Sequence, residues 1–533
     1  MSTYKSPVGT ADLLPEMAHR WQSIQQTAAE VFTLYNYLPI EVPTFEQLEV
    51  FTHGIGVNTD VVGKEMFQVS ALHASTPDAE PDDQPQELFA LRPEGTAGVT
   101  RAVIQHNLVQ SGSTALKVYY AGPMFRYERP QKGRLREFHQ IGVEIIGAAE
   151  PTADAEVIDM MMRFFAEIGL PTEDMLLKIN SMGDDQCRPA YRESIKAFIE
   201  NHPDLCPDCQ RRADTNPLRA FDCKNEKCQS IMQGAPKITD ALCDDCATHY
   251  QTVKDLLQIS GIDYEEDHRL VRGLDYYTRT VFEVQMLSGL GSQNAIGGGG
   301  RYDRLIEILG GQPTPGLGFA LGYERIALAL DAAGIRPYLM PRPLIYVVAV
   351  DADCRSTAYR IASQLRESYF SVEVDHQMRS TKSQFRNADR SKAAFTVVIG
   401  PDEIANSTAT IRSMFNGDEV IVTQSNLLDT LFDLVSQALE EDLVSDDDFN
   451  YLAMAFERVM LHSMMPDFTD RTRAEIDDFD EDEIMVFEFD YDEDDDDDYD
   501  EDEDEILVFE FDDDDFDFDD DDDFGDNLDD DDD

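Results

Sequence analysis

The segment KVYYAGPMFRYERPQKGRLREFHQIGVEIIG, residues 117–147, decides the fold that we expect for this chain. Residues 118–128 are rich in β-forming and aromatic side chains, and residues 137–146 alternate strongly. Both patterns are typical of strands, and the charged loop between them predicts a hairpin.

The second strand of this hairpin predicts the floor of a binding pocket. Because a strand turns successive side chains to opposite faces, Gln140, Gly142 and Glu144 share one face. Two hydrogen-bonding groups that flank a glycine suit a pocket, since the glycine leaves room for a ligand.

The hairpin loop gathers positive charge in a chain whose formal net charge is −64. Guanidinium groups pair bidentately with phosphate oxygens, so the cluster indicates phosphate binding, with a solvated basic hairpin as the alternative. Its members are Arg126, Arg129, Lys132, Arg134 and Arg136.

A second polar group stands where a strand is expected to meet a helix. Residues 88–104, LFALRPEGTAGVTRAVI, predict a strand that runs into a helix through a charged turn. At such a helix start, Glu94, Gly95 and Thr96 bring one carboxylate and several backbone amides together. From these residues alone, helix capping and ligand binding are both open.

Four runs of the sequence resemble the histidyl-tRNA synthetases, a family of class II aminoacyl-tRNA synthetases. FRYERPQKGRLREFHQIGVEIIG is similar to their motif 2, HRLVRGLDYYTRTVFEV to a signature found in histidyl enzymes, and LGFALGYERIALAL to motif 3. SPVGTADLLPEMAHRW, with the helix expected at residues 16–35, is similar to the motif 1 region. The chain departs from the family at Val8, where arginine is usual, and at Arg304, where glycine is usual.

The resemblance implies a role for each matched polar residue. Arg272 and Arg126 would be catalytic, because fixed cations stabilise the charge that builds during phosphoryl transfer. ATP would be held by Arg126, Arg134, Arg272 and Arg325. Histidine would be held by Glu94, Gly95, Thr96, Gln140, Glu144, Tyr276, Tyr277 and Tyr302, with Glu94 on the α-ammonium group and Glu144 and Tyr277 against the imidazole. No residue is assigned as a metal ligand.

The fold class that we expect is α+β. Residues 1–335 would form a class II catalytic core on an antiparallel sheet, interrupted by a cysteine-containing insertion at residues 184–263. Apolar runs of strand length alternate with helical patterns at residues 342–437, which predicts a small α/β domain with a largely parallel sheet. That domain resembles the anticodon-binding domain of several class II enzymes. Its RNA contacts would come from Arg379, Lys382, Gln384 and Arg386, with a solvated helix face as the alternative.

The insertion carries three closely spaced cysteine pairs, which are Cys206 and Cys209, Cys223 and Cys228, and Cys243 and Cys246. Tetrahedral thiolate coordination is the usual structural zinc site, so a structural zinc is possible. Reduced, buried thiols are the alternative, and the sequence does not decide between them.

Residues 438–533 form an acidic low-complexity tail that we expect to be disordered. From residue 440 onward the chain holds 48 of its 107 acidic residues and 3 arginines. Blocks of like charge repel one another and do not build a packed core. The run EIMVFEFD at residues 483–490 recurs as EILVFEFD at residues 505–512, an imperfect repeat with no assigned role.

The resemblance implies that ATP activates L-histidine to histidyl-adenylate, with Mg²⁺ beside the ATP, and that the histidyl group passes to tRNA(His). It also implies a homodimer through the motif 1 region. The sequence has no apolar run long enough for a membrane span and no apolar signal-peptide segment at its start, so we expect a cytoplasmic protein with no membrane partner. Two other classes of protein are the alternatives to this function. One is a non-catalytic synthetase paralogue, such as a regulatory subunit of ATP phosphoribosyltransferase, and the other is an interaction protein organised around the tail.

Overall fold

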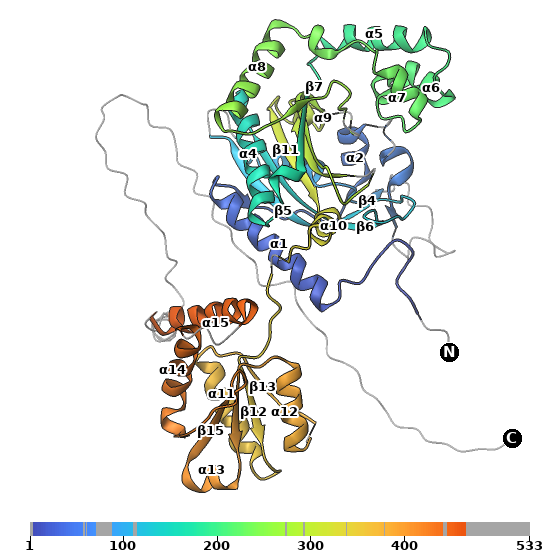
Figure 1. The fold of residues 1–533 in the computed structure, drawn as a ribbon. Helices are drawn as coiled ribbons and strands as arrows, with labels where there is room; N and C mark the ends of the chain where they lie inside the picture. Colours follow the sequence, from blue (N-terminus) through green and yellow to red (C-terminus); the bar gives the residue numbers. More distant parts are fainter. Residues whose placement is uncertain are drawn as a thin grey trace, which may run out of the picture. The chain divides into compact units, whose positions relative to one another are not determined.

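The computed structural model describes residues 4–56, 59, 61–70, 88–109, 114–271, 274, 276–291, 294–336, 338–377, 379–440 and 445–464 (Figure 1). Arg272, the Pro/Asp-rich loop at residues 71–87 and the acidic segment from residue 465 onward lie outside these residues. The expected disorder of the tail therefore stays a prediction. No helix in the described ranges is both long and apolar enough to cross a membrane.

An eight-stranded sheet organises the N-terminal part of the chain. Its strand order is β1-β5-β6-β11-β10-β9-β7-β8, and neighbouring strands are antiparallel except in the edge pairs β1·β5 and β7·β8. The expected antiparallel core is thus confirmed. The bounds are β1 Leu38–Pro39, β5 Leu116–Phe125, β6 Glu137–Ile146, β7 Met175–Ser181, β8 Glu265–Glu266, β9 Thr278–Met286, β10 Ala295–Arg301 and β11 Gly316–Gly322.

The hairpin that the sequence predicts is formed by β5 and β6, whose pairing runs from Leu116 opposite Ile146 to Phe125 opposite Glu137. One face of β6 presents Ile141, Val143 and Ile145 to the largest apolar core. The opposite face carries Gln140, Gly142 and Glu144, because side chains alternate along a strand. The sheet therefore separates an apolar layer from a polar one.

Four helices supply side chains to the apolar layer. They are α1 (Pro15–Thr33), α4 (Pro151–Glu167), α8 (Asp244–Ile259) and α10 (Tyr323–Ala333), and Figure 1 shows α1, α4 and α8 along one side of the sheet. Helix α1 begins at a proline, whose fixed φ suits the first helical position. It buries Trp21, Ile24, Ala28 and Phe32, residues spaced three or four apart that share one helix face. Its bounds lie close to the predicted residues 16–35.

The polar layer is completed by short elements. A three-stranded sheet of β2 (Phe45–Gln47), β4 (Phe89–Leu91) and β3 (Gln68–Val69) lies next to α2 (Leu48–Ile55) and α3 (Thr96–Gln105). The turn between β4 and α3 holds Glu94 and Gly95. The predicted passage from strand to helix at residues 88–104 is confirmed.

The insertion is helical and has its own small apolar core. It consists of α5 (Arg188–Glu200), α6 (Pro207–Thr215), α7 (Glu226–Met232) and short 3-10 turns, and the chain then returns to the sheet through α8. Figure 1 shows α5, α6 and α7 grouped beside the strands. Cys209, Cys223 and Cys228 lie within this core.

A second, five-stranded sheet forms the C-terminal domain, in the order β13-β12-β14-β15-β16. Strands β13 (Val372–Val374), β12 (Ile345–Ala349) and β14 (Phe395–Ile399) are parallel, as predicted. The antiparallel pair β15 (Thr408–Ser413) and β16 (Glu419–Thr423) was not predicted, although Asn416-Gly417 between them is a typical hairpin turn. The helices are α11 (Arg355–Glu367), α12 (Thr381–Arg390), α13 (Pro401–Asn406), α14 (Leu427–Glu440) and α15 (Asp446–Met464).

Candidate active site

Two buried carboxylates form the centre of the candidate site. Glu94 and Glu144 expose only 5% and 1% of their surface. Glu94 Oε2 accepts a hydrogen bond from the Thr96 amide and Oε1 accepts one from the Ala97 amide, both at 2.8 Å. Glu94 therefore caps helix α3, and the Tyr276 hydroxyl lies 3.5 Å from its Oε2. Burial raises the pKa of Glu94, while the two amides and the charge of Arg126 oppose that rise.

Glu144 is held by three hydroxyl groups. Its Oε1 accepts hydrogen bonds from Thr96 Oγ1 at 2.7 Å and from the Tyr120 hydroxyl at 3.3 Å, and its Oε2 accepts one from the Tyr302 hydroxyl at 2.5 Å. Burial raises the pKa of Glu144 to about 8 against these hydrogen bonds, and the charge of Glu94 adds to the rise.

The two buried carboxylates favour a ligand that carries positive charge. Among the described residues, neither carboxylate forms an ion pair with a lysine or an arginine. Burial of an unpaired carboxylate is costly, and a nearby cation relieves that cost. The site is thus suited to a ligand that brings one or two cationic or N–H groups.

Glycines allow side chains to approach the strands closely at this point. Gly318 of β11 pairs with Glu144, and a Cβ on Gly318 would lie 2.0 Å from Glu144 Oε2 and 2.2 Å from the Val143 carbonyl oxygen. A Cβ on Gly142 would lie 2.3 Å from the Tyr120 ring. The expectation that Gly142 leaves room for a ligand is therefore wrong in this structure, because the ring of Tyr120 fills that space.

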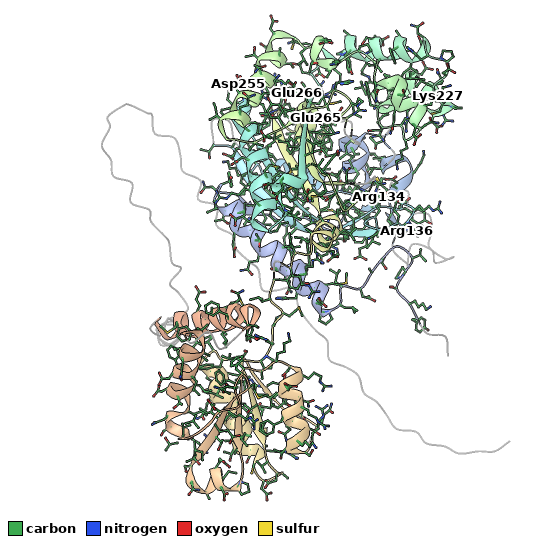
Figure 2. All side chains as sticks on the ribbon, in the orientation of Figure 1. Arg134, Arg136, Lys227, Asp255, Glu265 and Glu266 are labelled. Atoms are coloured by element: carbon green, nitrogen blue, oxygen red, sulfur yellow. The ribbon has the colours of Figure 1, made fainter. Side chains whose placement is uncertain are left out.

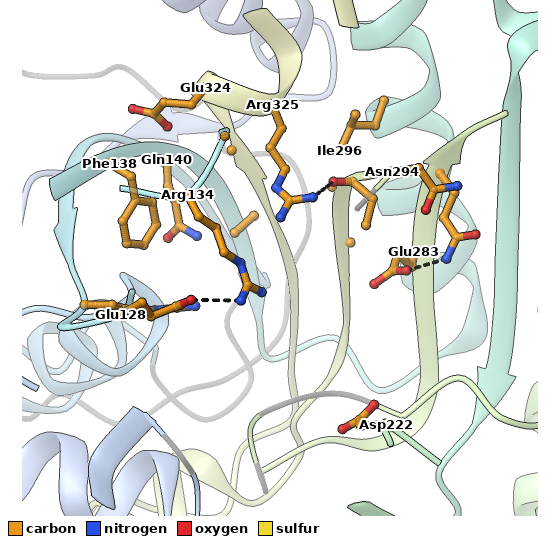
Figure 3. Close-up of a pocket in the computed structure, with 18 of the residues that line it drawn as sticks. Glu128, Arg134, Phe138, Gln140, Asp222, Glu283, Asn294, Ile296, Glu324 and Arg325 are labelled. Atoms are coloured by element: carbon orange, nitrogen blue, oxygen red, sulfur yellow. Dashed lines mark hydrogen bonds and ion pairs between the residues drawn. The ribbon is translucent and has the colours of Figure 1, made fainter. Parts of the chain in front are cut away.

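A cavity of about 590 Å³ is lined by Gln140 of β6 and by Arg126, whose charge acts on Glu94 (Figure 3). Arg126, Arg134 and Arg325 line it, and Figure 3 shows Arg134 and Arg325 on different elements of its wall. Hydrogen bonds fix all three guanidinium groups: Arg134 pairs with Glu128 at 2.8 Å, Arg325 donates to the Ala295 carbonyl at 3.2 Å, and Arg126 donates to the Pro93 carbonyl at 2.9 Å. Burial and the charge of Arg134 lower the pKa of Arg325.

Gln140 connects the cavity with the carboxylates. It lines the cavity and lies four residues before Glu144 on the same face of β6. Its Oε1 is buried and has no hydrogen-bond partner among the described residues. Because buried polar atoms are almost always hydrogen-bonded, this oxygen is ready to accept a bond from a ligand.

Most residues that the sequence assigns to histidine binding are brought together. A single hydrogen-bonded cluster contains Glu94, Thr96, Glu144, Tyr276 and Tyr302, and Gly95 packs against the Tyr120 ring. The Tyr277 ring packs against the Tyr276 ring at an interplanar angle of 47°, with ring centroids 4.7 Å apart. The hydroxyls on Glu144 come from Thr96, Tyr120 and Tyr302. The placement of Glu144 and Tyr277 against the imidazole stays a prediction.

The structure places some of the predicted phosphate-binding arginines at the cavity, but not all of them. Arg126, Arg134 and Arg325 reach the cavity, whereas Arg272 lies outside the described residues. Arg134 and Arg136 both extend from the hairpin loop (Figure 2), but Arg136 lies over the Tyr127 ring at 3.9 Å and donates to the carbonyl of Glu128. Arg136 thus stabilises the loop itself.

Two features of the site were missed from the sequence. Tyr120 could have been found, because the hairpin register places it opposite Gly142. The insertion also lines the cavity, through Phe221, Asp222, Lys224 and Gln229, and no motif in the sequence indicates this contact.

The two compartments define the chemistry. An acidic, tyrosine-rich cluster suits the ammonium and ring nitrogens of an amino acid, and an arginine-lined cavity suits a nucleoside triphosphate. On an antiparallel sheet with a separate α/β domain, this combination agrees with the resemblance to the class II aminoacyl-tRNA synthetases.

Comparisons with known proteins agree. The Histidyl-tRNA synthetase family profile matches residues 9–183 and 213–326, and the Anticodon binding domain profile matches residues 344–434. The chain is 43% identical over 432 residues to a Halothermothrix orenii protein named Histidine–tRNA ligase, covering 81% of this chain and 99% of that protein. It is 44% identical over 420 residues to a protein of the same name from Anaeromyxobacter sp. strain K, covering 79% and 97%. The crystal structure of apo S. aureus histidyl-tRNA synthetase superposes with a TM-score of 0.66 at 35% identity, covering 80% of this chain and all of that one.

The chain therefore belongs to the histidyl-tRNA synthetase family and is an enzyme that ligates histidine to tRNA. These relatives favour that activity over a non-catalytic paralogue.

Proposed function

We propose that the acidic cluster binds L-histidine and that the arginine-lined cavity binds ATP. Glu94 would pair with the α-ammonium group and Glu144 with an imidazole nitrogen, with Tyr276, Tyr277 and Tyr302 around the ring. Gln140 would accept a hydrogen bond from the substrate between the two compartments. The observation that carries this proposal is the pair of buried carboxylates beside a cavity lined by three arginines.

The first step is the formation of histidyl-adenylate. A carboxylate oxygen of histidine attacks the α-phosphorus of ATP, the bond from that phosphorus to the bridging oxygen breaks, and pyrophosphate leaves with the electron pair. Positioning and charge neutralisation supply most of the acceleration in such transfers. Arg126 and Arg272 would stabilise the α-phosphate, and Arg134 and Arg325 the rest of the triphosphate. In the second step, a hydroxyl of the terminal ribose of tRNA(His) attacks the acyl carbon and AMP leaves.

Mg²⁺ would enter with ATP and neutralise part of the phosphate charge. Magnesium is usually held by one or two carboxylates together with substrate phosphates. Glu283 fits this requirement, because its carboxylate lines the cavity and its charge acts on Arg325.

Exchange of labelled pyrophosphate into ATP tests the proposed reaction directly. The exchange should require histidine and be absent with other amino acids. An exchange that proceeds without histidine, or equally well with phenylalanine, would contradict the assignment of the acidic cluster.

We expect Arg325→Ala to lower kcat/KM for ATP by about 100-fold or more, because that is the usual cost of removing one donor that stabilises developing charge. The KM for histidine should change much less, since Arg325 lies in the cavity and not in the carboxylate cluster. Pyrophosphate exchange at varied ATP and histidine measures both. Arg163→Ala is the matched control, because Arg163 is half-exposed on α4 and forms an ion pair with Glu167 on its own helix. Equal losses in the two variants would rule out the proposed role.

We also propose a homodimer through the motif 1 region. Strand β1 forms one edge of the eight-stranded sheet, and residues 4–45 expose many large apolar side chains. These are Tyr4, Val8, Leu14, Met17, Leu34, Leu38 and Phe45. Exposed apolar side chains that are concentrated in one segment support an interaction site there.

Light scattering should therefore find the wild type as a dimer at micromolar concentration and Leu38→Glu largely as a monomer. A buried charge at the interface would have no partner, which costs several kcal/mol. Leu287→Glu is the control, because Leu287 is 61% exposed and Leu38 is 67% exposed. A wild-type monomer, or a dimer that Leu38→Glu leaves intact, would contradict this interface.

For tRNA, we propose a contact on α12 of the C-terminal domain. Arg379, Arg386 and Arg390 line a cavity of about 370 Å³ there, together with Ser383 and Asn387. Gln384, which the sequence assigned to RNA contact, is instead 4% exposed and hydrogen-bonded to the backbone of Ala349 and Arg379.

The domain limits and the location also remain proposals. The catalytic core would span residues 1–335 with the insertion at 184–263, the anticodon-binding domain residues 342–437, and the tail residues 438–533. We propose a cytoplasmic location, since all eight cysteines are free of disulfide bonds and tRNA charging takes place where translation does.

A further inference from the structure

The cysteines of the insertion gather into two clusters that the proposed reaction does not use. The first contains Cys206, Cys209, Cys223 and Cys228, and the second contains Asp184, Cys187, Cys243 and Cys246. Within each cluster, one potential ligand atom from every residue lies within 4.8 Å of all the others. The sequence showed the three cysteine pairs, but the structure adds Cys187 and Asp184 and decides which pairs share a cluster.

The spacing of these atoms fits tetrahedral coordination. In a zinc site with bonds of about 2.3 Å to sulfur and about 2.0 Å to oxygen, two sulfurs lie roughly 3.8 Å apart and a sulfur and an oxygen roughly 3.5 Å apart. The Sγ atoms of Cys206 and Cys223 are 3.8 Å apart. In the second cluster, Asp184 Oδ1 lies 3.4 Å from Cys187 Sγ and 3.7 Å from Cys243 Sγ.

The local backbone brings helix N-termini to both clusters. Cys206, Cys187 and Cys243 are the N-cap residues of α6, α5 and α8, and Cys209, Cys228 and Cys246 lie in the first turns of α6, α7 and α8. Helix N-termini stabilise negative charge and lower the cost of a thiolate. Backbone amides also donate to the sulfurs: Cys206 N–H to Cys228 Sγ at 3.2 Å, and Asp184 N–H to Cys187 Sγ at 3.3 Å.

Packing alone does not account for this arrangement. A buried free cysteine behaves as a small apolar side chain, and an apolar core has no reason to direct four sulfurs at one point. In the second cluster, the carboxylate of Asp184 points at sulfurs, although Arg279 Nη2 lies 3.9 Å from its Oδ2. A carboxylate among thiols is typical of a metal site.

We propose that the insertion binds two structural zinc ions, one held by the four cysteines of the first cluster and one held by Asp184 and the three cysteines of the second. Each thiol gives its proton to solvent on binding, and with four protein ligands neither ion has a position for substrate. The first site joins α6 to α7 and fixes the segment around Cys223, next to the cavity-lining Phe221, Asp222 and Lys224. The second site joins the chain entering the insertion, at residues 184–187, to the chain leaving it, at residues 243–246. The family profile does not match residues 184–212, which hold half of each ligand set.

The wild-type full chain, expressed with zinc supplied and purified without chelators, should contain two zinc ions per chain by mass spectrometry of the metal. Growth with Co²⁺ in place of zinc should give protein with thiolate-to-cobalt absorption, which does not need any variant to fold. A chain with no tightly bound metal and no such absorption overturns both sites. If the chain holds one ion, variants of the correct site will remove it, and the site whose variants leave the ion in place is wrong.

Matched variants assign each ion to its site. Cys209→Ser and Asp184→Ala should each lower the content from two ions to one, whereas Asp184→Cys should keep two, because a thiolate replaces the carboxylate. Cys354→Ser should also keep two, since Cys354 lies in the apolar core of the C-terminal domain and belongs to neither cluster. If Asp184→Ala keeps two ions, the second site is wrong, whatever the effect on activity.

Discussion

Glu144→Gln should lower kcat/KM for histidine by about 100-fold or more, because a site built on hydrogen bonds to its substrate loses affinity steeply when one partner is mismatched. The amide keeps the size of the carboxylate, but it brings two N–H donors to a point where Thr96, Tyr120 and Tyr302 already present hydroxyl donors. It also cannot ionise to give the negative charge that would pair with the imidazole. Pyrophosphate exchange at varied histidine measures the effect, and the KM for ATP should stay nearly constant. Glu173→Gln, at an exposed carboxylate, is the control.

The same variant has a signature in the pH dependence of stability. Burial raises the pKa of Glu144 to about 8 in the folded enzyme from an ordinary value of 4.5. Between these two values the folded state holds a proton that the unfolded state has lost, so the contribution of Glu144 to stability falls as pH rises through this window. Between pH 5 and 8 in the absence of histidine, the Tm of the wild type should therefore fall more steeply than the Tm of Glu144→Gln. Parallel curves would show that Glu144 is not held in this buried state.

Gly318→Ala should damage the fold and the site together. The new Cβ would meet Glu144 Oε2 at 2.0 Å and the Val143 carbonyl oxygen at 2.2 Å, and the backbone oxygen cannot move without breaking the pairing of β6 with β11. Overpacking of this kind costs on the order of 3 kcal/mol, and displacement of Glu144 adds the loss of histidine binding. We expect a lower Tm and almost no histidine-dependent exchange.

The control for this substitution is Gly63→Ala, because a Cβ there meets no atom within 4 Å and Gly63 has no positive φ. Its Tm and exchange rate should match those of the wild type. If Gly318→Ala also matched the wild type, the close packing of β11 on the Glu144 side chain would be wrong.

The sequence predicted the local structure of the site well, because the information is local. Alternating side chains defined β6 to the residue, and they placed Gln140, which lines the cavity, on the same face as Glu144. Side-chain partners were harder to predict. The hydroxyl of Tyr302 donates to Glu144, although the two residues are 158 positions apart in the chain. The Glu144 side chain fits over β11 at this point because Gly318 has no side chain. Such a contact depends on strand order and register, which a single sequence does not reveal.

The cysteines show the same limit. The spacing in Cys206-x-x-Cys209 and Cys243-x-x-Cys246 marks each as half of a metal site, but spacing does not say which halves meet. Cys243 and Cys246 meet Asp184 and Cys187 and no other cysteine pair, since the chain leaves and re-enters the sheet at neighbouring strands β7 and β8. Only the topology brings these residues together.

The insertion wall of the proposed ATP cavity has a consequence for inhibition. A compound that fills this cavity would touch the arginines on one side and Phe221, Asp222 and Lys224 on the other. The proposed reaction would constrain the first wall, whereas the second comes from outside the eight-stranded sheet and carries no proposed role in either reaction step. Resistance to such a compound could therefore arise by substitution at Phe221 or Lys224 while every arginine of the cavity stays in place.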